Sequence, residues 1–260
     1  MRIALGVEYR GGAFCGWQTQ PSGCAVQDVL ERALAEIAGE KIATVCAGRT
    51  DAGVHALAQV VHFDTAAERP ESAWVRGVNT LLPDGAAVTW SLRVAADFHA
   101  RYSARERCYR YVLFNHPLRP ALNHGRVGWF HLPLDLDRMR AGAQHLLGEH
   151  DFSAFRAAEC QAKSPVRELR RLDIRKCGDH IVFELAANAF LHHMVRNIVG
   201  SLVYVGKGKH EPEWLASILA SRDRKQAAPT LDAAGLYLAH VSYDARWELP
   251  QSARNAWFSG

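Results

Sequence analysis

Residues 42–64 of the chain read IATVCAGRTDAGVHALAQVVHFD, two apolar runs on either side of one polar segment. The runs at 42–47 and 58–64 are short and contain β-branched residues, which is typical of strands. The polar segment between them, 48–56, has two glycines that allow a tight excursion of the backbone. Because functional residues often lie on loops held by rigid strands, Asp51 is a candidate site residue. A plain strand connection, in which Asp51 closes a local turn, is the competing interpretation.

The elements around this stretch give the first half of the chain a regular order. A strand is predicted at 2–9, followed by a glycine-rich turn and by a helix from Val26 that Gly39 ends. A second helix at 72–82 and a strand at 86–94 follow the two central strands. The order β-α-β-β-α-β is the ferredoxin-like plan.

The second half repeats this order more loosely. Its predicted elements are a strand at 107–114, a helix capped by Asp135, strands at 168–176 and 180–187, helices at 190–205 and 213–219, and a strand at 235–243. The expected fold class is α/β (α+β), with two ferredoxin-like or RRM-like halves, mainly antiparallel sheets flanked by helices, and a central cleft. We expect the halves at 1–104 and 105–245, with a tail at 246–260. A single α+β domain whose element order repeats by coincidence is the alternative.

The composition excludes some classes of protein. No apolar run approaches the roughly 20 residues of a membrane span, and the N-terminus becomes charged too early for a signal peptide. We therefore expect a cytoplasmic protein that uses no membrane. The net charge is only +4, but residues 1–104 carry 9 basic and 11 acidic side chains, whereas residues 105–260 carry 22 and 16. The positive surplus, which would favour contact with phosphates, lies in the second half.

The cysteines and histidines favour neither disulfides nor a metal site. The six cysteines stand singly without a C-x-x-C pair, which predicts reduced and mostly buried thiols. The thirteen histidines form no H-E-x-x-H motif and no cluster with cysteine, so we expect no metal.

A segment rich in arginine and tyrosine occupies residues 98–111. Its tyrosines offer flat faces on which a base can stack, and its arginines form a positive patch: Tyr102, Tyr109 and Tyr111, with Arg101, Arg105, Arg107, Arg110 and, nearby, Arg119. On a strand, Tyr109 and Tyr111 share one face and Arg110 lies on the other. An amphipathic strand with its tyrosines in the core is the competing interpretation.

The helix predicted at 190–205 carries one arginine within an apolar pattern. Arg196 lies between members of the buried stripe rather than opposite them, so it needs a carboxylate partner if it is buried. Asp51 is the candidate partner. The alternative is an arginine whose stem covers the core while its head reaches water.

Together these segments resemble the tRNA pseudouridine synthase A (TruA) family. The resemblance runs from Val7 to about Tyr243, and we place no motif in the tail at 246–260. The matching motifs are G-W-Q-x-Q-P at 16–21, V-Q at 26–27, G-R-T-D-A-G-V-H at 48–55, H-A-R-Y-S-A at 99–104, R-C-Y-R-Y at 107–111, C-Q at 160–161, S-P-x-R at 164–167 and N-A-F-L-H-H-M-V-R-N-I-V-G at 188–200. The family often has a threonine where Cys24-Ala25 precedes Val26.

The resemblance implies an isomerase with the pseudouridine synthase fold that converts uridine to pseudouridine at positions 38, 39 and 40 of the tRNA anticodon stem-loop. It implies that the enzyme uses no cofactor and no metal, and that it forms a homodimer. The residues that match the family's catalytic positions are Asp51, Tyr109 and Arg196, and Arg49 matches the arginine that replaces the flipped base. Further substrate contacts are expected at His55, Arg101, Arg107 and Arg110, besides Tyr109.

This chemistry suits a carboxylate. The reaction breaks the N1–C1′ bond, turns the uracil and joins C5 to C1′. An ionised Asp51 could attack C1′ or C6, or remove a ribose proton, and the sequence leaves these three open. Arg196 would supply its counter-charge, and Tyr109 could stack on the detached uracil. A uridine paired in a stem must also be flipped out of the helix.

Two other functions compete with this one. A non-catalytic RNA-binding protein with two RRM-like halves would need aromatic residues on open sheet faces, and it would leave Asp51 without a role. A hydrolase or metal site built on Asp51 and His55 lacks a third partner, so we rank it last.

Overall fold

The computed structural model describes residues 1–250, and contacts between residues divide them into two compact units. Unit 1 comprises Met1–Arg105 and the described residues from Tyr237 onward, and unit 2 comprises Glu106–Leu236. Among the described helices, none is long and apolar enough to cross a membrane. The predicted tail, 246–260, lies mostly outside the described residues.

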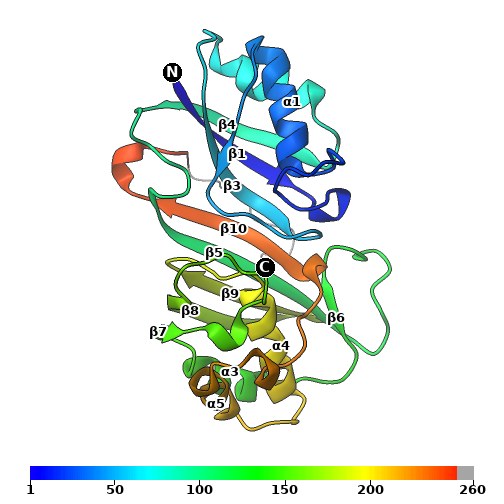
Figure 1. Cartoon of the computed structure of the whole chain (residues 1–260). Coiled ribbons are helices and arrows are strands. Elements are labelled where there is room, and N and C mark those ends of the chain that lie inside the picture. Colours follow the sequence, from blue (N-terminus) through cyan, green and yellow to red (C-terminus); the bar gives the residue numbers. More distant parts are fainter. Residues whose placement is uncertain (251–260) are drawn as a thin grey trace. The chain divides into compact units, whose positions relative to one another are not determined.

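Unit 1 follows the predicted order of elements. Its helices and strands are β1 (Arg2–Tyr9), α1 (Val26–Ala38), β2 (Val45–Cys46), β3 (His55–Asp64), a π-helical turn (Ala73–Gly77), α2 (Val78–Leu81), β4 (Ala86–Val94) and β10 (Leu236–Tyr243). Antiparallel pairing gives the strand order β4-β1-β3-β2, which is the ferredoxin-like order. Helix α1 (Figure 1) packs against α2 and the π-helical turn. The Trp74 ring of that turn lies 5.3 Å from the Phe63 ring of β3.

One edge of β3 is shared by two strands, each of which pairs with it over two residues. Strand β2 pairs at Val61 and His62, while β10 pairs in parallel at His55 and Ala56. The sequence predicts a longer strand at 42–47, but only two residues of it pair with β3. It also assigns the strand at 235–243 to the half at 105–245, whereas contacts group all but the first residue of β10 with unit 1.

Unit 2 contains an antiparallel sheet in the order β5-β9-β8-β7 with three helices packed together beside it (Figure 1). Its elements are β5 (Ala104–Asn115), β6 (Gly128–Phe130), α3 (Leu136–Gln144), β7 (Gly148–Asp151), β8 (Val166–Cys177), β9 (His180–Ala187), α4 (Met194–Gly206) and α5 (Trp214–Ser221). The predicted cap is confirmed, since the Asp135 carboxylate accepts the backbone N–H groups of Asp137 and Arg138. The expected fold class, mainly antiparallel sheets flanked by helices, is therefore confirmed.

The expectation of six reduced thiols is wrong for two of them. Cys15 and Cys24 form a disulfide, with their Cα atoms 5.5 Å apart. The turn between them uses positive φ angles at Gly16 (90°) and Gly23 (67°), which fold the segment back on itself. The separation of nine residues between the two cysteines does not by itself predict such a turn, so the sequence gives no sign of the disulfide. The buried thiols of Cys46 and Cys108 fit the expectation.

A buried histidine on β3 makes unit 1 sensitive to acid. The His62 ring is 4% exposed, and its Nδ1 accepts the backbone N–H of Ala100 at 3.1 Å. Burial, with smaller effects from Arg2 and His99, lowers the pKa of His62 from 6.5 to about 4, while Asp64 opposes the shift. Since the folded-state pKa lies below the unfolded value, this contribution to stability is complete above pH 6.5 and is lost as the pH falls towards 4.

We therefore expect the substitution His62→Asn to flatten the acid branch of the stability curve. Each unit of pKa difference is worth about 1.4 kcal/mol, so the wild-type fold loses up to about 3 kcal/mol over this window. Thermal melts from pH 7.5 to pH 4 would measure the effect. His124→Asn, at an exposed position, is the control and should melt like the wild type; an unchanged pH slope in His62→Asn would contradict the prediction.

Candidate functional site

Asp51 lies on the loop between β2 and β3, the position that the sequence predicts for a site. The backbone of this loop is tied to β3 where Ala47 donates to Val60 O at 2.8 Å, and it closes a local turn where Val54 donates to Asp51 O at 3.1 Å. Gly53 has a φ of 82°, which favours glycine at this turn. The Asp51 side chain is half-buried, so the loop presents a carboxylate without removing it from solvent.

Thr50, immediately before Asp51, anchors the middle of the loop. Its carbonyl accepts the backbone N–H of Trp17 at 2.9 Å, and its hydroxyl lies 2.7 Å from the Tyr9 hydroxyl. Gln59 on β3 adds a further clamp, because its side-chain amide donates to Gly48 O at 2.7 Å. These bonds tie the loop to β1, to the turn at Trp17 and to β3. The two supporting side chains, those of Tyr9 and Gln59, have no obvious signal in the sequence.

The other predicted residues of unit 1 differ in exposure. Arg49 is exposed on the Asp51 loop and Arg101 is exposed after β4, with its guanidinium 5.7 Å from the Tyr102 ring centroid. His55 is only 3% exposed; its Nδ1 accepts the Gly11 N–H at 3.1 Å, and its ring stacks on Tyr237 at 4.6 Å. His55 thus supports the first residues of β3, and its contact with substrate stays a prediction.

In unit 2, Tyr109 lies on β5, where it contacts both β9 and the turn that precedes α4. Tyr109 pairs with Leu185 of β9, is 8% exposed and meets the Phe190 ring edge-on at 5.0 Å. The predicted common face of Tyr109 and Tyr111 agrees with their burial. Tyr111 is fully buried, its hydroxyl donates to Asp232 O at 2.9 Å, and burial raises its pKa.

Two predicted RNA contacts on β5 have protein partners. Arg110 forms an ion pair with Glu184, the residue opposite it on β9, at 2.5 Å, and both side chains are partly shielded from solvent. Arg107 donates to Asn188 O at 3.1 Å. The patch on this strand is therefore less positive than the arginine count indicates.

Arg196 lies in the first turn of α4, which begins at Met194 rather than at the predicted residue 190. His193 precedes the helix with a φ of 62°, so residues 190–193 turn instead of extending it. Arg196 is half-buried, and its Nε donates to Leu231 O at 2.7 Å. The first turn of α4 therefore holds a guanidinium at a defined position within unit 2.

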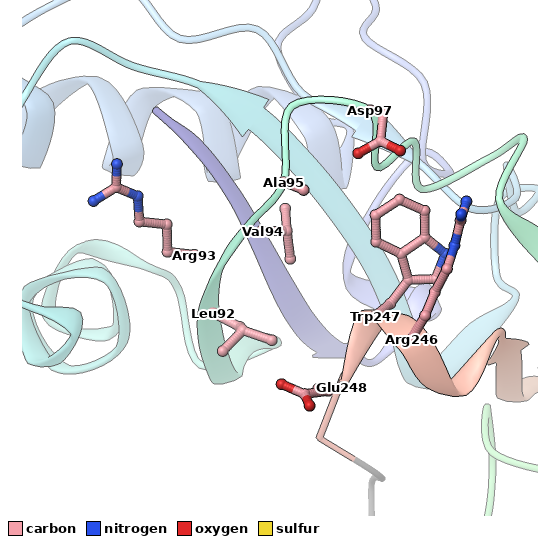
Figure 2. A pocket seen from close by; sticks show the side chains of 8 residues that line it. All are labelled: Leu92, Arg93, Val94, Ala95, Asp97, Arg246, Trp247 and Glu248. Atoms are coloured by element: carbon pink, nitrogen blue, oxygen red, sulfur yellow. The ribbon is translucent and has the colours of Figure 1, made fainter.

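A surface hollow of about 370 Å³ lies elsewhere in unit 1 (Figure 2). It is lined by the end of β4 and by the chain after β10, namely Leu92, Arg93, Val94, Ala95, Asp97, Arg246, Trp247 and Glu248. Within the described chain, none of the predicted site residues lines this hollow. We therefore do not assign it to the site.

Comparisons with known proteins give the family. A sequence model described as tRNA pseudouridine synthase matches residues 6–103 and 143–244. A protein of Thiobacillus denitrificans described as tRNA pseudouridine synthase A is 60% identical to this chain over 253 residues, which cover 97% of each chain. A protein of Dechloromonas aromatica with the same description is 59% identical over 250 residues, which cover 96% of this chain and 95% of that one.

A solved structure of an H/ACA RNP bound to a substrate RNA containing 2′-deoxyuridine is similar with a TM-score of 0.37 and 12% identity; the match covers 77% of this chain and 44% of that one. The assignment depends on the sequence matches, which span almost the whole chain. The chain belongs to the tRNA pseudouridine synthase A family.

Proposed function

We propose that this isomerase converts uridine to pseudouridine at positions 38, 39 and 40 in the anticodon stem-loop of tRNAs. The observation that carries the proposal is the half-buried Asp51 carboxylate. Its loop is held at Thr50, whose carbonyl accepts the Trp17 N–H and whose hydroxyl bonds the Tyr9 hydroxyl. A carboxylate held in this way is suited to a reaction whose reacting atoms must be aligned closely. The choice of these three positions follows from the family resemblance.

The proposed reaction needs a carboxylate and no net oxidation or reduction. The N1–C1′ bond breaks, the uracil turns, C5 bonds to C1′, N1 gains a proton and C5 loses one. Ionised Asp51 acts as the nucleophile at C1′ or C6, or as the base that removes a ribose proton. The proposal uses no cofactor and no metal.

Tyr109 and Arg196 complete the proposed catalytic set. The Tyr109 ring stacks on the detached uracil and holds it while it turns. The Arg196 guanidinium supplies a positive charge for the anion that develops during the reaction. The fixed positions of both side chains in unit 2, against Phe190 and Leu231 O respectively, favour these roles.

We assign RNA contacts to the basic residues that the sequence singles out. Exposed Arg49 takes the place of the flipped base, and exposed Arg101 contacts a phosphate. Arg107, Arg110 and His55 are proposed as further contacts. Phosphate contacts of this kind make binding depend on salt. We also propose a homodimer and a cytoplasmic location, both from the family resemblance and the sequence.

Asp51→Asn tests the central claim. The amide keeps the size of the side chain but lacks the negative charge, so release of tritium from [5-³H]uridine-labelled tRNA should fall by about 10⁴-fold or to background. Binding of tRNA, measured by filter retention, should stay near the wild-type value. Asp84→Asn, on an exposed loop, is the matched control. Retained turnover in Asp51→Asn would exclude Asp51 as the catalytic group, and a wild-type protein that binds tRNA without any turnover would favour the non-catalytic alternative.

Tyr109→Phe separates the ring from its hydroxyl. If stacking is the whole role, Tyr109→Phe should keep turnover within about threefold of the wild type, and Tyr109→Leu should lose on the order of 100-fold. Single-turnover rates on unmodified tRNA would measure both. Equal losses in the two variants would assign the role to the hydroxyl instead.

Arg196→Lys keeps a charge but loses the planar fork of donors. We expect a fall in the single-turnover rate of about 100-fold, because the lysine cannot reproduce the position of the guanidinium. Arg140→Lys, on the exposed side of α3, is the control and should behave like the wild type. An Arg196→Lys variant that turns over at the wild-type rate would contradict a catalytic role for this guanidinium.

A further inference from the structure

The Cys15–Cys24 disulfide has no role in the function proposed so far. The two cysteines flank the family-like motif at 16–21 without belonging to it, and they close the segment between β1 and α1. This segment is one of the parts of unit 1 that support the Asp51 loop, through the backbone of Trp17.

The disulfide joins two ends of a turn that is also tied to the start of α1. Cys15 N–H donates to Cys24 O at 3.1 Å, alongside the covalent bond. Beyond it, Val26 N–H donates to Gly16 O and Gln27 N–H donates to Trp17 O, both at 3.0 Å. The cross-link thus fixes residues 16 and 17 against the first turn of the helix.

Residues 16 and 17 are in direct contact with the backbone around Asp51. Trp17 N–H donates to Thr50 O, and the Trp17 side chain is 1% exposed. A Cβ added at Gly16 would lie 3.1 Å from both Thr50 O and Ala52 N. Because no space separates the two segments, a displacement of residue 16 would move the residues on both sides of Asp51.

The disulfide is also the cysteine site most open to small reagents. Cys15 is exposed and Cys24 is half-buried, with the Ser22 hydroxyl 3.0 Å from the Cys24 sulfur. Cys46 and Cys108 are buried, and burial raises the pKa of the Cys46 thiol to about 12 and that of Cys108 in the same direction. Thiolate is the reactive form, so these two compete poorly for oxidants.

We propose that Cys15 and Cys24 form a reversible thiol–disulfide site that positions the Asp51 loop, and that reduction slows turnover while leaving tRNA binding intact. The inference rests on the proposed role of Asp51. The two cysteines are positioning residues, since they act through residues 16 and 17 on the loop. Cys15, Cys24 and their disulfide touch none of the reacting groups in the proposed mechanism.

The step is an exchange with a dithiol. One thiolate of the dithiol attacks the exposed Cys15 sulfur, the S–S bond breaks, and Cys24 leaves as a thiolate that the Ser22 hydroxyl can stabilise by donating a hydrogen bond. The second thiol of the dithiol then attacks the mixed disulfide and releases Cys15. The dithiol loses two electrons and two protons and becomes a cyclic disulfide, and the protein gains two thiols.

The test combines chemistry, kinetics and hydrogen exchange on the full-length protein. Differential alkylation and peptide mass spectrometry, before and after treatment with dithiothreitol, show whether residues 15 and 24 are joined. Steady-state kinetics of the oxidised, reduced and reoxidised protein are then compared with those of Cys15→Ser/Cys24→Ser. Cys177→Ser, at the β8–β9 hairpin, is the matched control. Hydrogen exchange at residues 48–54 reports the loop itself.

We expect reduction to lower kcat about tenfold, less than the roughly hundredfold that a displacement of 1 Å can cost, with KM unchanged within about twofold. Reoxidation should restore kcat, the double variant should match the reduced protein in both conditions, and Cys177→Ser should respond like the wild type. Hydrogen exchange at 48–54 should become faster on reduction.

Two results would overturn the inference: free alkylation of both cysteines in protein treated with an oxidant, or a disulfide whose reduction changes neither kcat nor exchange at 48–54. The exchange measurement does not depend on Asp51 being catalytic. Faster exchange together with an active Asp51→Asn variant would therefore refute the proposed role of Asp51 and not the positioning of its loop.

Discussion

The two hydrogen bonds of Thr50 determine where unit 1 presents the Asp51 carboxylate. One is accepted by its carbonyl from Trp17 and the other joins its hydroxyl to Tyr9, so the segment after β1 and the end of β1 meet at a single residue. Thr50 and both partners are buried. An unpaired polar group at a buried position would lower the free energy of unfolding by about 1–3 kcal/mol. The loop is polar in composition, yet its backbone is hydrogen-bonded to β3, to the segment at Trp17 and within its own turn.

The sequence predicts best those elements whose pattern depends on local periodicity. The strands at 2–9, 86–94 and 180–187 have the predicted limits, because each is a short run rich in apolar residues beside a glycine-containing turn. Strand β2 is shorter than predicted, since only Val45 and Cys46 pair with β3. The helix at α4 starts late because His193 adopts a left-handed conformation, which no hydrophobic pattern encodes.

At the site, residue types were predictable and their partners were not. The loop position of Asp51 follows from apolar strands on either side of it. The pairing of Arg110 with Glu184 depends on the register between β5 and β9, and that register brings together residues 74 positions apart. The disulfide depends in the same way on the path of a turn. Sequence therefore identifies the charged groups, whereas tertiary structure decides which charges are already neutralised.

The parallel pairing of β10 with β3 has a consequence for synthesis of the chain. Residues 55 and 56 pair with residues 237 and 238, so unit 1 is interrupted in the sequence by the whole of unit 2. A ribosome makes β3 long before the strand that covers this part of its edge. During that interval, the backbone groups of β3 that follow the Asp51 loop lack β10, and an open strand edge is a template for wrong pairing. The first residues of β3 thus gain their parallel partner only after the whole of unit 2 has been made, and contacts this distant in sequence make folding slow.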